Sequence, residues 1–183
     1  KLKEYQEQSN DWLFGYLTYD LKNDVEKLTS NNIDEIAFPD LFFFQPKKVI
    51  RIINNIVYFD YLKLVNDEIE SDYNTIINEA LFEETTFCGE APKIKLRISK
   101  DTYKEKIALV KNHIAKGDIY EVNYCQEFYA ENALINPLPT YNALNAISKP
   151  PMACFLKTEN LYALCASPER YINKQGVTIT SQP

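Results

Sequence analysis

The residues best placed to do chemistry lie near the carboxyl end of the sequence, in the segment Ser167-Pro168-Glu169-Arg170. Pro168 and Glu169 stand between two strand-like stretches, where a carboxylate can reach a cavity without disturbing the hydrogen bonds of a sheet. A carboxyl group in a partly apolar pocket can hold a proton and donate it to a poor leaving group such as hydroxide. Taken alone, the segment fits either a general acid at Glu169 or a surface glutamate paired with Arg170.

Other kinds of site find little support in the sequence. The chain has 4 cysteines and 1 histidine with no metal-ligand spacing, so we predict no metal site among these residues: Cys88, Cys125, Cys154, Cys165 and His113. We expect reduced cysteines, although a turn at Glu159-Asn160 would place Cys154 opposite Cys165. The 4 glycines are scattered, which excludes a glycine-rich phosphate loop.

Composition narrows the class of protein further. Hydrophobic residues make up 45% of the 183 residues, enough for a folded core, and the net charge of -6 without a basic cluster argues against binding to nucleic acid. The apolar runs are shorter than a membrane-spanning helix, and Lys1 to Asn10 is too polar for a signal peptide. We therefore expect a globular, cytoplasmic protein that binds small molecules or proteins and does not associate with membranes.

Strand patterns dominate the elements that must position Glu169. The sequence predicts strands over 12–19, 41–44, 49–53, 56–59, 94–98, 119–129, 152–157, 161–166, 170–173 and 177–181. Tight turns at Asn54-Asn55, Glu159-Asn160 and 174–176 would join neighbouring strands into antiparallel hairpins. The predicted acid thus lies between two consecutive hairpins.

Helical patterns are fewer. The clearest helix runs from Asp101 to Ala115, with Ser99 or Asp101 as its cap and Gly117 just past its end. Weaker helical patterns cover 21–28, 67–82 and 141–147, and a proline-rich loop is expected at 136–139. We interpret His113 as a structural residue of the clear helix. Segregated helices with many hairpins are typical of an α+β fold with antiparallel sheets.

Four stretches in this order resemble component I of the chorismate-utilising enzymes. They are FGYLTYDL at 14–21, GDIYEVNYCQEF at 117–128, PPMACFL at 150–156 and SPERY at 167–171. The resemblance is nearest to aminodeoxychorismate synthase component I, a relative of anthranilate synthase component I. It implies antiparallel sheets packed across each other with outer helices, present here only as a partial fold. Glu121 is a departure, because the family usually has glutamine there.

The resemblance also implies roles for individual residues. Glu169 matches the glutamate that protonates the departing hydroxyl of chorismate, and Ser167, Pro168 and Arg170 would frame it in the substrate site. Pro151, Met152 and Ala153 match the segment that lines the family's aromatic amino-acid pocket, a feedback site in anthranilate synthases.

Residues 1–183 would then be the amino-terminal and central part of one chorismate-binding catalytic domain, with its carboxy-terminal half absent. In the family, the segment after SPERY continues as Pro-Ile-Lys-Gly-Thr or Pro-Ile-Ala-Gly-Thr, and Pro183 matches that proline. The lysine that forms the covalent adduct and the ligands of the Mg²⁺ cofactor would lie after it. We expect this chain alone to be inactive, and exposed sheet edges to allow its self-association.

For the intact enzyme, the resemblance implies folate biosynthesis, in which chorismate is aminated with ammonia from a glutamine amidotransferase subunit. Two enzyme alternatives stay open: anthranilate synthase component I in tryptophan biosynthesis, and isochorismate or salicylate synthase, which use water. A regulatory relic that binds an aromatic amino acid without catalysis is the alternative outside enzymes.

Overall fold

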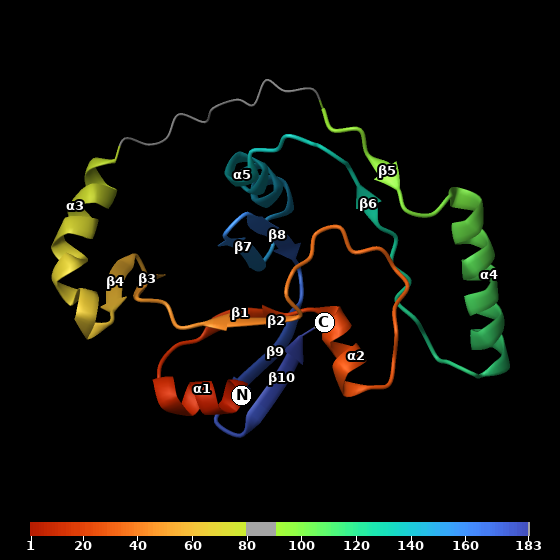
Figure 1. The fold of residues 1–183 in the computed structure, drawn as a ribbon, viewed down its shortest axis with the longest axis horizontal. Coiled ribbons are helices and arrows are strands. Elements are labelled where there is room, and N and C mark those ends of the chain that lie inside the picture. Colours follow the sequence, from red (N-terminus) through yellow and green to blue (C-terminus); the bar gives the residue numbers. More distant parts are fainter. Residues whose placement is uncertain (80–90, 183) are drawn as a thin grey trace. The chain divides into compact units, whose positions relative to one another are not determined.

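The structure, a computed structural model, describes residues 1–79 and 91–182 (Figure 1). Contacts divide the chain into two compact units. Lys1–Glu83 with Lys157–Tyr162 forms the first, and Glu84–Leu156 with Ala163–Pro183 forms the second. None of the described helices combines the length and the apolar character needed to cross a membrane.

Two antiparallel strand pairs organise the first unit. The helical segments are α1 (Leu2–Ser9), η1 (Tyr19–Leu21), α2 (Lys22–Val25), η2 (Lys63–Glu68) and α3 (Ile69–Asn78), and the strands are β1 (Phe14–Leu17), β2 (Leu41–Phe44), β3 (Lys48–Ile53) and β4 (Ile56–Tyr61). β1 pairs with β2, and β3 with β4. Asn54 and Asn55 have φ values of 50° and 62°, which confirms the predicted hairpin turn because a tight turn of this kind needs positive φ at both positions.

Three further strand pairs and two helices follow the undescribed residues. The strands are β5 (Lys95–Leu96), β6 (Phe128–Tyr129), β7 (Met152–Thr158), β8 (Leu161–Ser167), β9 (Arg170–Gln175) and β10 (Thr178–Gln182), and the helices are α4 (Lys100–Lys116) and α5 (Pro137–Ser148). β5 pairs with β6, β7 with β8 and β9 with β10. Helices together with antiparallel pairs confirm the predicted α+β class.

Helix α4 confirms the clearest helix prediction and identifies its cap. The Ser99 hydroxyl accepts a hydrogen bond from the backbone N–H of Thr102 at 3.1 Å, so Ser99 rather than Asp101 caps the helix. Gly117 ends it with a φ of 80°, a left-handed conformation that glycine adopts without strain.

Several predicted boundaries were wrong. The strand expected at 119–129 exists only as Phe128–Tyr129, because only these residues pair with Leu96 and Lys95 in the described part of the chain. The expected loop at 136–139 instead begins α5, where Pro137 fits the first helical turn because its N–H is not needed there. α1 was not predicted at all, and residues 80–82 of the predicted helix at 67–82 lie outside the described residues.

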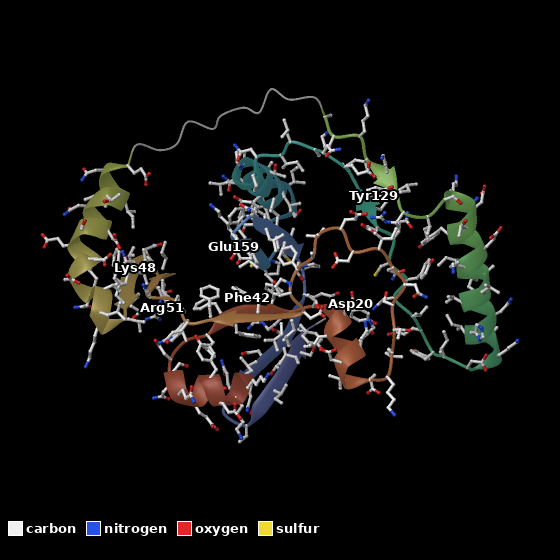
Figure 2. The ribbon with its side chains drawn as sticks, viewed as in Figure 1. Asp20, Phe42, Lys48, Arg51, Tyr129 and Glu159 are labelled. Atoms are coloured by element: carbon white, nitrogen blue, oxygen red, sulfur yellow. The ribbon has the colours of Figure 1, made fainter. Side chains whose placement is uncertain are left out.

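Packing in the first unit relies on aromatic side chains rather than on full burial. Among the described residues only Val65 is buried, at 7% exposure. The Tyr16 ring meets Phe38 edge-on with centroids 5.5 Å apart, and it stacks on Phe42 at 5.8 Å. Phe42 (Figure 2) in turn lies 5.7 Å from Phe44, so these rings hold β1 and β2 together beyond their hydrogen bonds.

Candidate functional site

Glu169 lies in the short connection between β8 and β9, as predicted. Ser167 is the last residue of β8, and its hydroxyl both accepts a hydrogen bond from the Glu169 N–H at 3.2 Å and donates one to the Glu169 carbonyl at 3.1 Å. This reciprocal contact fixes the backbone of the glutamate while its side chain stays exposed. Pro168 between them adds a fixed φ, so the turn presents the carboxylate from a rigid base.

Arg170 begins β9 and is half-buried. Its Cα is paired with that of Gln182 on β10, beyond a register shift between Thr180 and Gln182. The Arg170 Nε atom is buried, and within the described residues it has no hydrogen-bond partner. An unsatisfied guanidinium N–H is costly to bury. Arg170 therefore has an unused donor next to Glu169 in sequence. The surface ion pair between their side chains, which was the alternative to a general acid, is not among the contacts of the described residues.

The second predicted cluster begins strand β7. Pro151 lies in the turn before β7 and is exposed, and Met152 and Ala153 are its half-buried first residues. β7 pairs with β8, and Glu159 between them has a φ of 50° in a tight turn. Strands joined by so short a turn run antiparallel, so the start of β7 lies beside the end of β8. The structure thus brings Pro151–Ala153 and Ser167–Arg170 to one end of the same hairpin.

The other residues considered for chemistry, His113 and the cysteines, have structural roles or no partner in the described residues. Nδ1 of His113 lies 2.7 Å from the Asp118 carboxylate, an acidic neighbour that the sequence reading missed although it is five residues away. Both residues flank the Gly117 cap and join the end of α4 to the following segment. Cys125, Cys154 and Cys165 are free thiols, and Cys88 lies outside the described residues.

The implied Mg²⁺ finds no ligand set in the described part of the chain. There, no three histidine, cysteine, aspartate or glutamate side chains come together as metal ligands would. The described donors form no magnesium site, and because the resemblance implies ligands after Pro183, the Mg²⁺ cofactor stays a prediction.

The first unit also contains an ionic cluster that was not predicted from the sequence. Nζ of Lys48, labelled in Figure 2, lies 2.6 Å from carboxylate oxygens of both Glu68 and Asp72, and the Tyr61 hydroxyl donates to Asp72 at 2.7 Å. The spacing of Glu68 and Asp72 was the available signal, because residues four apart share one face of a helix. Their contacts with β3 and β4 give the cluster a structural role in holding α3 on the hairpin.

Comparison with known proteins places this arrangement in a family. Residues 1–183 match the family described as chorismate binding enzyme. Aminodeoxychorismate synthase component 1 of Bacillus subtilis is 22% identical over 92% of this chain and 38% of that protein. Anthranilate synthase component 1 of Thermus thermophilus is 24% identical, again over 92% of this chain and 38% of that protein.

A solved structure supports the same fold. The crystal structure of anthranilate synthase component I from Streptococcus pneumoniae TIGR4 matches with a TM-score of 0.73 and 20% identity, over 90% of this chain and 40% of that one. The chain thus spans about two fifths of the length of these relatives. Because relatives named for two reactions match at similar identity, they establish the family without distinguishing the reaction. From the match along its whole length, this chain belongs to the chorismate-binding enzyme family.

Proposed function

We propose that the protein to which these residues contribute aminates chorismate to 4-amino-4-deoxychorismate in folate biosynthesis. The observation that carries the proposal is Glu169, held at a strand end by Ser167 within the SPERY segment. The name of the Bacillus subtilis relative supports the choice of reaction, as does the resemblance of Ser181-Gln182-Pro183 to the folate enzyme. We further propose that the protein acts in the cytoplasm with a glutamine amidotransferase subunit that supplies ammonia.

In this proposal Glu169 is the general acid. Hydroxide is a poor leaving group, and a carboxyl group that donates a proton to the departing oxygen lets water leave instead. The two hydrogen bonds of the Ser167 hydroxyl keep the backbone of Glu169 in place, which limits the positions that the carboxyl can take. The Arg170 guanidinium, with its Nε unsatisfied in the described residues, would donate to an anionic group of the substrate.

Replacing Glu169 by glutamine in the full-length enzyme tests the role of the acid. Glutamine keeps the size and polarity of the side chain but has no proton of suitable acidity, so we expect turnover of chorismate to fall by roughly 10²- to 10⁴-fold. Binding of chorismate, measured by calorimetry, should change little. Glu159→Gln in the turn of the same hairpin (Figure 2) is the matched control and should keep turnover. Normal turnover in Glu169→Gln would remove Glu169 from the mechanism.

Anthranilate synthase is the second candidate, favoured by the names of the Thermus relative and of the solved Streptococcus structure. In that case the product formed from chorismate and ammonia is anthranilate, which chromatography separates from 4-amino-4-deoxychorismate. Tryptophan binding then becomes informative, because Pro151–Ala153 would line a feedback pocket. A protein that binds tryptophan but neither binds nor converts chorismate would instead be a regulatory relic.

A further inference from the structure

A cavity in the first unit lies outside everything assigned above. Its volume is about 410 Å³, within the range of small-molecule sites. Its lining residues include Trp12, the apolar residues Pro46, Val49 and Leu62, and the acidic residues Asp11 and Asp60. All of these residues belong to the first unit, whereas Glu169 and Pro151–Ala153 belong to the second. The cavity therefore does not depend on the proposed active site.

The two carboxylates differ in how their charge is balanced. Asp60 forms an ion pair with Arg51, whose Nη2 donates to it at 3.2 Å. Asp11 accepts hydrogen bonds from the Gln45 side-chain amide and from the Trp12 backbone N–H, both at 2.8 Å. These two neutral donors, of which Gln45 has the larger effect, hold the pKa of Asp11 below its usual range. Asp11 is thus ionised at neutral pH, and among the described residues it forms no ion pair.

The Trp12 ring already accepts a cation from the protein itself. The Arg51 guanidinium carbon lies 5.4 Å from the centroid of this ring, and on the other face of the hairpin Nζ of Lys48 lies 5.4 Å from the centroid of Tyr61. Figure 2 shows Lys48 and Arg51 on this part of the first unit. Such distances fall within the reach of cation–π attraction. The Trp12 ring beside the unpaired Asp11 carboxylate forms a surface that attracts a positive charge attached to an apolar body.

We propose that this cavity binds a small organic ammonium ion, with its charged nitrogen at Asp11 and its apolar body against Trp12 and Val49. The Asp11 carboxylate supplies a charge-assisted hydrogen bond, and the Trp12 ring supplies apolar contact and cation–π attraction. Anions and neutral molecules of the same size lack the first of these interactions. The ligand class therefore follows from the charge of the cavity as well as from its size.

The single tryptophan of the chain makes the test direct. Trp12 lines the cavity and is the only tryptophan among the 183 residues, so its fluorescence emission reports on occupancy. Benzylamine, protonated at neutral pH, should give a saturable change in emission, and benzyl alcohol, of similar size but uncharged, should bind at least about tenfold more weakly. This comparison needs no variant. No saturable change with benzylamine, or equal affinity for both probes, would overturn the proposal.

A pair of variants then locates the charge. Asp11→Asn should bring the affinity for benzylamine down to that for benzyl alcohol. Asp34→Asn is the matched control, because the Asp34 carboxylate also accepts backbone N–H bonds, from Ile36 and Ala37 at 3.0 Å, but does not line the cavity. Asp34→Asn should leave the affinity for benzylamine unchanged. Equal losses in the two variants would show that net charge, rather than this cavity, attracts the probe, and would contradict the site.

Discussion

At the scale of single residues, the contacts of Lys48 make the first unit sensitive to pH. The hydrogen bond from Lys48, and then that from the Tyr61 hydroxyl, lower the pKa of Asp72 below its ordinary value of 3.8. The hydrogen bonds to Asp72 and then Glu68 raise the pKa of Lys48 above 10.5. A lowered carboxyl pKa contributes stability that is complete above 3.8 and is lost as pH falls through the folded-state value. A raised lysine pKa contributes stability that is complete below 10.5 and is lost as pH rises further.

We therefore predict that α3 is held most firmly on the β3–β4 hairpin between these two limits. The urea midpoint, followed by circular dichroism, should fall as the solution is acidified from about pH 5 to 2. Asp72→Asn should lower the midpoint at neutral pH and flatten this acid dependence. Asp67→Asn removes a carboxylate that forms no ion pair in the described residues, so it should keep the wild-type profile. An unchanged profile in Asp72→Asn would contradict the role of the cluster.

Some features of the candidate site can be predicted from single residues in the sequence, and others cannot. The position of Glu169 between strands follows from the pattern around Pro168, because proline and alternating apolar residues mark strand ends. The hydrogen bonds between Ser167 and Glu169 and the unsatisfied Nε of Arg170 cannot be predicted from residue spacing, since they depend on side-chain rotamers. Likewise the cavity beside Asp11 is lined by residues from three separate stretches of the sequence, and no local motif predicts it.

At the scale of elements, local turn chemistry decided which strands were predictable. Asn54-Asn55 and Gly176 adopt the positive φ that tight turns require, and the strands around them were found close to their predicted bounds. The predicted strand at 119–129 is not joined to a neighbour by such a turn. Its alternating side-chain pattern alone could not show whether a partner strand lies beside it. Strand formation there depends on distant pairing, which explains why the sequence overestimated it.

Gly15 supplies a testable prediction about the β1–β2 pair. It stands opposite Phe43, and a Cβ atom at Gly15 would overlap the Phe42 carbonyl oxygen and approach the Phe43 Cα to 2.8 Å. Both atoms are backbone, so they cannot swing away. We expect Gly15→Ala to destabilise the fold by about 1–3 kcal/mol, as overpacked substitutions do. Thermal unfolding followed by circular dichroism measures this loss.

Gly117→Ala separates overlap from backbone strain. At Gly117 a Cβ atom meets nothing within 4 Å, and only its φ of 80° opposes the substitution. The expected cost is about 1–2 kcal/mol from the left-handed conformation, and the loss should be confined to the end of α4. Hydrogen exchange in β1 and β2 should accelerate in Gly15→Ala and stay unchanged in Gly117→Ala. Equal protection of β1 and β2 in wild type and Gly15→Ala would show that the strands tolerate the added methyl group.

At the scale of the whole molecule, apolar side chains remain exposed on strands that have open edges. In the described residues β10 pairs only with β9, and Ile179 on β10 is 66% exposed. Unpaired strand edges with exposed apolar side chains favour pairing with another chain. We therefore predict that residues 1–183 self-associate, and that sedimentation velocity shows larger species as concentration rises.

A lysine on the open strand should weaken this association, because a charged edge disfavours pairing with a second strand. Ile179→Lys removes an apolar side chain and adds a charge, whereas Thr178→Lys adds the same charge to the opposite face of β10 and keeps Ile179. If apolar contact through the Ile179 face drives association, only Ile179→Lys restores the monomer. If edge pairing alone drives it, both variants do so, because each places a lysine on the edge strand. A chain that stays monomeric at every concentration would instead mean that these apolar faces are covered within one molecule.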